Sequence, residues 1–150
     1  MPELPFPQIA LKDLYAELER RYGYSVPESE RGDMTTEAEQ LSYRFSQEAF
    51  GHEFLLVTDF AAEKRAFYHM RKDGVPQGYD LLWRGVEITT GAQREHRWDV
   101  LCRQAEERGL GADVQFYTEF FRYGCPPHGG FGLGLDRMTM LLTGTAIMEA

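Results

Sequence analysis

The chain has 150 residues, of which 43% are hydrophobic and 13% aromatic. It is therefore long enough to bury one core and too short for two ordinary domains. With 16 basic and 24 acidic residues, its net charge of -8 repels a polyanion at long range and argues against a broad electrostatic surface for nucleic acid. Any RNA contact is expected to be local, or to come from residues outside this chain.

Cysteine spacing and hydropathy indicate the expected redox state and location of the protein. Cys102 and Cys125 stand far apart, without the spacing of a zinc site or a disulfide framework, so we expect two reduced thiols. The first residues contain no basic segment leading into an apolar run, and no stretch of about 18 apolar residues follows. We therefore expect a cytoplasmic protein with no membrane partner.

The first third of the sequence predicts two amphipathic helices. From Ile9 onward, apolar residues recur at mostly helical spacing and stop before Gly23, a typical helix end. A second helix is expected to begin at Thr35 or at Thr36, where a capping box starts, and to end at Gly51. Both apolar stripes are interpreted as core-facing scaffold.

After residue 51 the pattern changes to short runs of β-branched and aromatic residues. Such runs predict strands at residues 54–59, 66–70, 79–84 and 86–90. The turn-forming segment 72–78 favours an antiparallel meander. Helical patterns return at residues 97–108 and 113–122, and a last strand through Phe131 and Leu133 leads to a helix that starts near Leu135. The expected fold class is α+β: an antiparallel β-sheet flanked by helices.

Acidic, hydroxyl and guanidinium groups crowd into residues 86–94. The Glu87 carboxylate and the Thr90 hydroxyl suit a hard cation such as Mg2+, and Arg94 offers a planar fork for a substrate carboxylate. Strict strand alternation would place Glu87 and Thr90 on opposite faces. A shared metal site therefore predicts a bulge or bend between them, which Gly91 permits. The alternative interpretation is a solvated strand edge.

A glycine-rich segment, residues 124–137, forms the second candidate cluster. Its five glycines let backbone approach a ligand closely, and the helix that follows would direct free amide groups at phosphate, with Arg137 as a fixed cation in its first turn. The spacing is not that of a Walker or dinucleotide motif, and a tight turn is the alternative. Zinc-protease and serine-hydrolase patterns are missing, and His69 and His96 are expected to be ordinary polar positions.

Read together, three ordered motifs resemble aspartyl-tRNA synthetases of the archaeal and eukaryotic type, which are class II enzymes. The motifs are residues 80–94 (DLLWRGVEITTGAQR), 121–130 (FRYGCPPHGG) and 132–137 (GLGLDR), the last of which resembles class II motif 3. Weaker similarity extends back through residues 32–39 to Phe6 and Pro7, so the resemblance covers nearly the whole chain.

The resemblance implies roles for particular residues. Glu87 and Arg137 would be catalytic, Glu87 and Thr90 would hold Mg2+, and Thr90 and Arg94 would bind aspartate. ATP would contact Glu87 together with a run in motif 3: Gly134, Leu135, Asp136 and Arg137. Thr90 stands where relatives usually have serine, and Asp136 where the nearest relatives usually have glutamate.

The resemblance also implies a partial domain. The chain is expected to be the C-terminal half of a class II catalytic domain, with motif 3 present and with motifs 1 and 2 and the anticodon-binding domain absent. The arginine that holds the α-phosphate in relatives would then lie outside it. We expect a homodimer or pairing with another chain, because an isolated half-sheet leaves apolar surface exposed.

The implied function is an aspartate–tRNA ligase that uses ATP and Mg2+ to activate aspartate and transfers it to the tRNA acceptor end. Two alternatives stay open. One is an asparagine synthetase-like enzyme in which ammonia replaces tRNA as the acceptor. The other is a non-catalytic paralogue that serves as a ligand-binding or interaction module.

Overall fold

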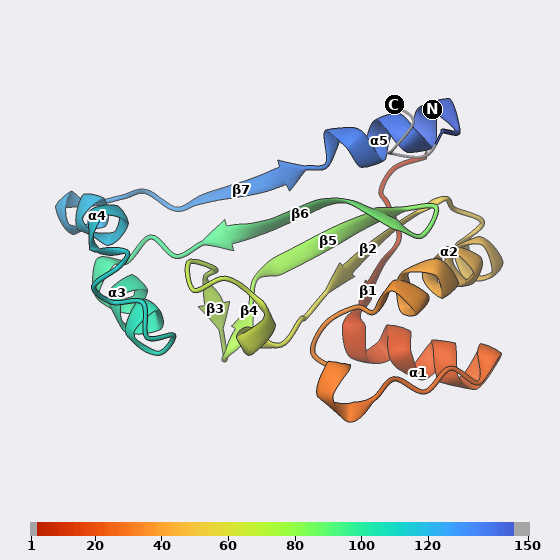
Figure 1. The fold of residues 1–150 in the computed structure, drawn as a ribbon, viewed down its shortest axis with the longest axis horizontal. Coiled ribbons are helices and arrows are strands. Elements are labelled where there is room, and N and C mark those ends of the chain that lie inside the picture. The colour runs from red at the N-terminus through yellow and green to blue at the C-terminus, as the bar shows by residue number, and fades with distance from the viewer. Residues whose placement is uncertain (1–2, 146–150) are drawn as a thin grey trace.

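The computed structural model describes residues 3–145 as a mainly antiparallel sheet with helices around it (Figure 1). The five strands of the sheet are hydrogen-bonded in the order β1-β2-β5-β6-β7. Their bounds are β1 Gln8–Ala10, β2 Phe54–Thr58, β5 Gly78–Trp83, β6 Val86–Arg94 and β7 His128–Leu133. The successive strands β2, β5, β6 and β7 pair antiparallel, as expected, although the meander predicted through residues 66–70 does not form; β1 runs parallel to β2. The predicted fold class is confirmed.

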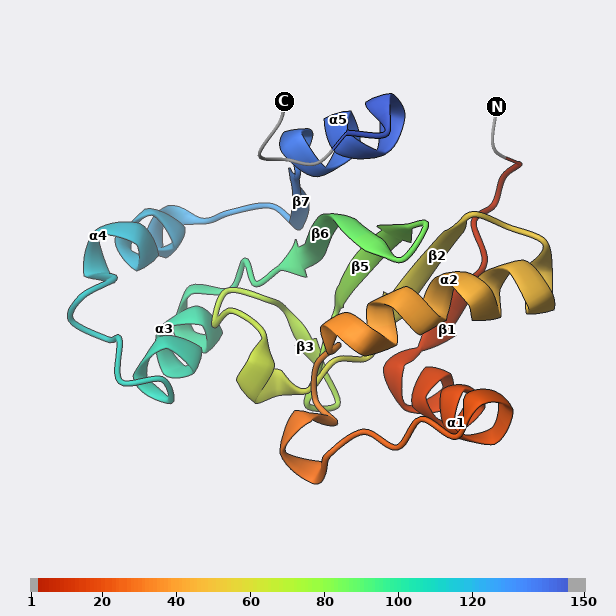
Figure 2. The same cartoon turned by 45° about the vertical axis from the view of Figure 1, so that its right-hand side comes forward.

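Helices gather at the two ends of the sheet. Their bounds are α1 Leu11–Tyr22, α2 Thr36–Phe50, α3 Trp98–Glu106, α4 Gln115–Thr118 and α5 Leu135–Thr143, with short 3-10 turns η1 Glu28–Glu30, η2 Ala62–Lys64 and η3 Glu119–Tyr123. Figure 1 shows α1 and α2 together beside β1 and β2, and α3 and α4 at the far end, where β6 stops and β7 starts. After a 45° turn, α5 lies across the sheet from α1 (Figure 2).

The main core lies between the first two helices and one face of the sheet. The α1 residues Leu14 and Leu18 are fully buried against Leu55 and Val57 of β2 and against Leu82 of β5. Each such side chain stabilises the fold by roughly 1.5–3 kcal/mol. A smaller core beneath α3 and η3 contains Phe67, Leu101, Ala105 and Phe121. The helices therefore follow the apolar stripes predicted for them.

Three local predictions are wrong. Ile9 does not belong to the first helix but to β1, because its backbone pairs with Val57. The cap of α2 is Thr35, whose hydroxyl accepts from the amide of Ala38, so the box expected at Thr36 does not start the helix. Residues 66–70 form no strand: they make a turn with a single bridge, and the segment after it is a short hairpin of β3 Arg71–Lys72 and β4 Val75–Pro76.

Candidate active site

The expected bulge lies in β6. Thr89 stands opposite Leu81 of β5, but Glu87, not Ile88, stands opposite Leu82, so Ile88 is the extra residue. An extra residue reverses the alternation of side chains beyond it. Glu87 and Thr90 therefore point to the same face of the sheet, where both can reach one ligand.

Opposite residues of an antiparallel pair share a face, which assembles the surroundings of these two side chains. We call this face, which includes Glu87, Thr90 and Arg94, the site face. On β5, Asp80 stands opposite Thr90, and Gly78 stands opposite Ala92. On β7, Gly132 stands opposite Thr90, Gly130 opposite Ala92, and His128 opposite Arg94. Four of these residues (Gly78, Ala92, Gly130 and Gly132) carry little or no side chain and form a low floor between Thr90 and Arg94.

At one end of the floor Arg65 neutralises a buried carboxylate. Its Nη1 and Nη2 donate to the two oxygens of Asp80 at 2.8 and 2.6 Å, and both side chains are at least 90% buried. Nη1 also donates to the Thr90 hydroxyl at 3.2 Å, and the guanidinium carbon lies 3.5 Å from the centre of the Phe60 ring. Arg65 follows a 3-10 turn, so no periodic pattern in the sequence marks it as a site residue.

At the other end of the floor Arg94 has no carboxylate partner among the described residues. Its guanidinium carbon lies 4.3 Å from the centre of the Tyr68 ring, a cation–π contact, and its nitrogens border Gly130. Within residues 3–145 its side chain makes no hydrogen bond or ion pair. A fixed guanidinium whose donors are unused is a ready partner for a carboxylate ligand.

Acidic groups gather around Glu87. Burial, and then the nearby Asp80, raise the pKa of Glu87. Burial, and then Glu87, raise the pKa of Glu39 on α2 to about 7. Both carboxyls therefore lack sufficient positive charge nearby, although Arg137 lies 3.4 Å from a Glu87 oxygen. A cation, or a basic part of a substrate, would relieve this repulsion.

The start of α5 joins the two predicted clusters. The amide of Gly134 donates to the carbonyl of Ile88 at 2.8 Å, which ties the helix to the bulge. Arg137, in the first turn, donates to the carbonyl of Glu87 at 2.7 Å. Leu135 and Asp136 are exposed. The structure thus brings Gly134 and Arg137 to β6, while Leu135 and Asp136 stand away from the packed residues.

A groove lies on the other face of the sheet, which we call the back face. It encloses about 880 Å³ and is lined by residues such as Gln8, Leu56, Tyr79, Leu81, Phe131 and Leu133. Asp59 also lines it, but none of the charged groups described above does. The chemistry therefore points to the site face, and the groove is interpreted as an uncovered apolar surface.

Two further observations concern the described residues. No helix among them is long and apolar enough to cross a membrane. In the same part of the chain, no three His, Cys, Asp or Glu side chains are placed to hold a metal ion together. A cation at Glu87 would thus depend largely on oxygens of a substrate or water, as Mg2+ commonly does.

Comparison with known proteins identifies the family of the chain. Residues 2–150 match the family model "tRNA synthetases class II (D, K and N)". The chain is 41% identical over 147 residues to the aspartate–tRNA(Asp/Asn) ligase of Aeropyrum pernix, covering 93% of this chain and 33% of that protein. It is 44% identical over 148 residues to the corresponding ligase of Methanopyrus kandleri, covering 96% and 32%.

Solved structures give the same result. The chain superimposes on the aspartyl-tRNA synthetase of Entamoeba histolytica with a TM-score of 0.85 and 33% identity, covering 96% of this chain and 30% of that one. For the asparaginyl-tRNA synthetase of Pyrococcus horikoshii the TM-score is 0.79 at 29% identity, covering 97% and 34%. The chain spans about a third of the length of the relatives it matches.

Proposed function

The chain belongs to the class II tRNA synthetases (D, K and N), and we propose that it is part of the catalytic domain of an aspartate–tRNA ligase. In this reaction a carboxylate oxygen of aspartate attacks the α-phosphorus of ATP, pyrophosphate leaves, and aspartyl-adenylate forms. A hydroxyl at the tRNA 3′ end then attacks the carbonyl carbon and loses its proton, and AMP leaves. The proposed setting is the cytoplasm.

The observation that carries the proposal is the guanidinium of Arg94, which is unpaired within residues 3–145. Asp80, the buried carboxylate on the same face, is already neutralised by Arg65, so Arg94 is left for a ligand. A bidentate pair favours a carboxylate side chain over a neutral amide, because an amide supplies only one acceptor oxygen and no charge. Thr90, between the two arginines on the same face, would complete the aspartate site.

The ATP end of the proposed site lies at the junction of β6 and α5. Arg137 would sit near the terminal phosphate, and Gly134, Leu135 and Asp136 would contact the nucleotide at the start of the helix, where amide groups favour anions. Catalysis would consist mainly of positioning and charge neutralisation.

Glu87 fits an Mg2+ site, because its pKa is raised by burial and by acidic neighbours that a divalent cation would compensate. Thr90 would add a second oxygen, since its hydroxyl accepts one bond from Arg65 and keeps another lone pair. When bound, Mg2+ would neutralise phosphate charge. Glu87 would hold that cation through the carboxylate that now faces Arg137.

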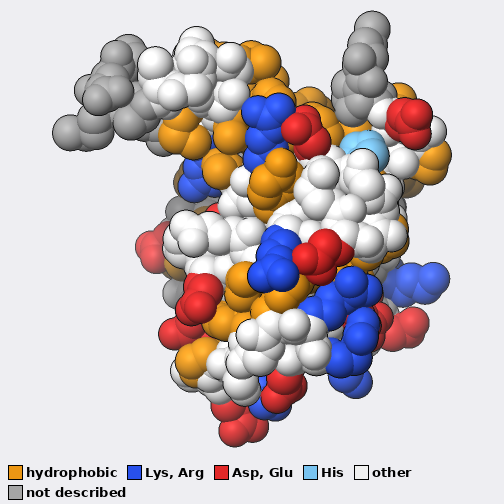
Figure 3. All heavy atoms as spheres, turned by 90° about the vertical axis from the view of Figure 1, so that its right-hand side faces the viewer, with side chains coloured by type: hydrophobic (Ala, Val, Ile, Leu, Met, Phe, Trp, Pro, Cys, Tyr) orange, Lys and Arg blue, Asp and Glu red, His pale blue; other side chains and the backbone are white. Residues whose placement is uncertain are grey.

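The tRNA partner is proposed to contact this chain only locally, or to contact residues outside it, because the net charge of the chain is -8. Figure 3 shows acidic and basic side chains interspersed on the end of the molecule that carries α1 and α2, without one broad basic patch. Some relatives are named for tRNA(Asp) alone and others for tRNA(Asp/Asn), so the proposal covers both kinds of acceptor.

The test is ATP–pyrophosphate exchange with the complete protein that carries this chain. We expect exchange that depends on aspartate, and about a 100-fold lower kcat/KM for aspartate in Arg94→Ala, because a buried ion pair is lost. Arg44→Ala, an exposed arginine on α2, is the matched control and should change it less than twofold.

Three outcomes would contradict the proposal in different ways. Absence of aspartate-dependent exchange in the wild-type protein would remove the enzyme assignment. Equal activity of Arg94→Ala and wild type would remove the role of Arg94. AMP formation that requires aspartate and ammonia but no tRNA would favour the asparagine-forming alternative.

A further inference from the structure

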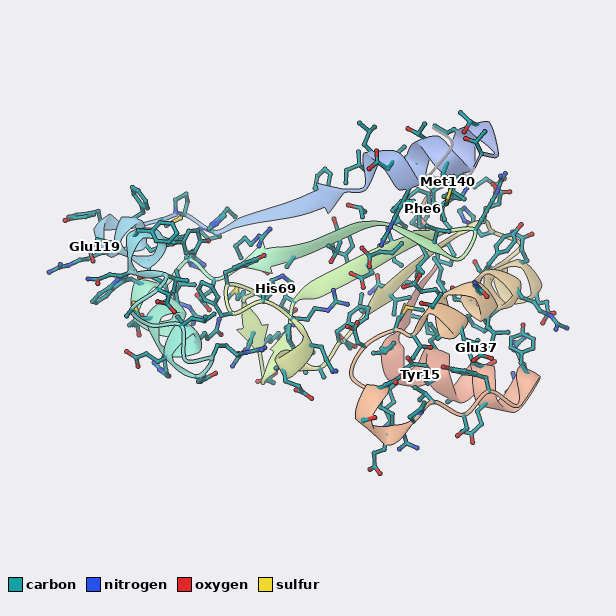
Figure 4. The ribbon with its side chains drawn as sticks, in the orientation of Figure 1. Phe6, Tyr15, Glu37, His69, Glu119 and Met140 are labelled. Atoms are coloured by element: carbon teal, nitrogen blue, oxygen red, sulfur yellow. The ribbon has the colours of Figure 1, made fainter. Side chains whose placement is uncertain are left out.

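His69 lies directly opposite Arg94 on the site face. The amide of Met70 donates to the carbonyl of Gln93, and the amide of Glu95 to that of Tyr68, both at 2.9 Å. This pattern makes His69 and Arg94 a non-hydrogen-bonded pair, whose side chains come closest in an antiparallel ladder. Figure 4 shows His69 in the middle of the molecule, beside β6. It therefore continues the row formed by Asp80 and Gly78.

The imidazole of His69 fills the space above Gly78. A Cβ atom at Gly78 would come within 3.0 Å of its Nδ1, so the absence of a side chain there makes room for the ring. His69 is only 7% exposed, and Nδ1 has no hydrogen-bond partner among the described residues. Gln104 of α3, also buried, donates to the carbonyl of His69 at 3.0 Å and fixes its backbone. The ring is thus held in place by packing.

The ring is neutral where it lies. Burial, and then the nearby Arg94 and Arg65, lower the pKa of His69 to about 4. Asp80 is the opposing charge near the ring. The neutral ring of His69 therefore stands in the row between Arg94, which is unpaired among the described residues, and the buried Arg65–Asp80 ion pair.

This arrangement bears on the availability of Arg94. Asp80 stands opposite Thr90, four residues from Arg94 along β6 on the same face, and opposite charges attract strongly where water is excluded. Asp80 has spare acceptor capacity, because each carboxylate oxygen can accept more than the single bond it receives from Arg65. The His69 ring fills the space above Gly78, the position that follows Asp80 in this row, and stands opposite Arg94.

We propose that His69 is a positioning residue, a neutral spacer that keeps Arg94 from pairing with Asp80 and so leaves its guanidinium free for the carboxylate of the substrate. The identity of that substrate rests on the proposed function; the spacer role does not.

Crystal structures of the ligand-free wild type and of His69→Ala test the spacer directly. In the variant we expect an Arg94 guanidinium nitrogen within hydrogen-bond distance of Asp80 and the contact with Tyr68 lost. In His69→Gln, which keeps most of the volume without charge, Arg94 should stay over Tyr68. His69→Ser replaces the alanine variant if the latter does not fold, as judged by its melting temperature. Arg94 remaining over Tyr68 in the variant that opens the gap would overturn the proposal.

Kinetics of the complete protein give the second measurement. An internal ion pair reduces the fraction of molecules that can bind, so we expect the KM for aspartate to rise about tenfold in His69→Ala. The KM for ATP should stay within twofold, and His69→Gln should stay near wild type. Equal increases of both KM values would indicate general damage and contradict a spacer. If the wild type lacks aspartate-dependent exchange, the proposed function fails, while the crystal structures still decide the role of His69.

Discussion

Three carboxylates close to one another on the site face have different chemistry, and their surroundings explain the difference. Asp80 is held by both nitrogens of the Arg65 fork. Glu87 has one arginine nearby, Arg137, whose nitrogen lies 3.4 Å from a carboxylate oxygen. Glu39 makes no ion pair within residues 3–145. Residue type alone therefore says little about which of the three is ready for a cation. The partner supplied by the fold decides it.

Glu39 gives a prediction about pH and stability. Its pKa in the folded protein, about 7, lies above the ordinary value of 4.5, so the folded state holds a proton that the unfolded state releases. Its contribution to stability is then lost as the pH rises from about 4.5 to 7. Glu39→Gln carries no charge at any pH. We expect its free energy of unfolding to match wild type near pH 4 and to exceed it by about 1 kcal/mol at pH 8, less than full linkage because Glu39 is partly exposed.

Urea unfolding across that pH range makes the measurement. Comparing variant with wild type cancels the opposite trend expected from His69, which both proteins retain. Glu37→Gln, an exposed position on the same helix, is the control and should show no such pH-dependent gain. A difference between Glu39→Gln and wild type that stays constant from pH 4 to pH 8 would contradict the assignment.

At the scale of elements, β6 organises the site. It pairs with β5 on one side and β7 on the other, and its bulge aligns Glu87 with Thr90. Gly91 is not the bulge residue. It lies opposite Tyr79 and Phe131 on the back face, where an added Cβ would come within 2.6 Å of the Tyr79 hydroxyl oxygen and 2.9 Å of the Phe131 Cβ. The absence of a side chain at Gly91 lets two aromatic residues pack across the strand.

Gly91→Ala should therefore destabilise the protein by about 1–3 kcal/mol through overpacking. Gly132→Ala, on the adjacent strand, is a matched control because an added Cβ there meets nothing within 4 Å. It should change the free energy of unfolding by less than about 0.5 kcal/mol. Thermal or urea unfolding of both variants makes the comparison, and equal losses in the two would refute the packing argument.

The whole molecule covers the two faces of its sheet unequally. Helices α1 and α2 pack on the site-face side of β2 and β5, whereas the groove of the back face is bordered by apolar residues of which Phe131 and Leu133 are 66% and 52% exposed. Apolar area of this extent is typical of a surface that meets another protein or another part of the same one. From the sequence we expect this surface to be covered by a second copy of the chain or by another chain.

We expect the chain, studied alone, to form a dimer through the back face. Phe131→Glu combined with Leu133→Glu should weaken that dimer at least about tenfold, because two charges would be buried in an apolar contact. Phe116→Glu with Phe120→Glu, at positions each 75% exposed near α4, is the control. Sedimentation velocity measures the outcome. A monomeric wild type, or a dimer lost only in the control variant, would refute this interface.

Much of the fold, and one strand of the site, followed from the sequence by itself. Helical spacing identified α1 and α2, because their apolar stripes are local patterns. The need to place Glu87 and Thr90 on one face predicted the bulge, because strand alternation is strict. The family motifs likewise selected Arg94 and Arg137, which the fold brings to the two ends of the same strand.

Only the tertiary structure decided which residues surround those on β6. Arg65 and His69 come from turns, and Glu39 comes from a helix whose pattern indicates packing alone. Their roles depend on distances across the sheet, which no local spacing encodes. β1 escaped prediction for the same reason: three residues become a strand only because β2 offers a parallel edge. Sequence periodicity specifies how a segment folds, whereas charge and packing between distant segments determine which groups are free to bind.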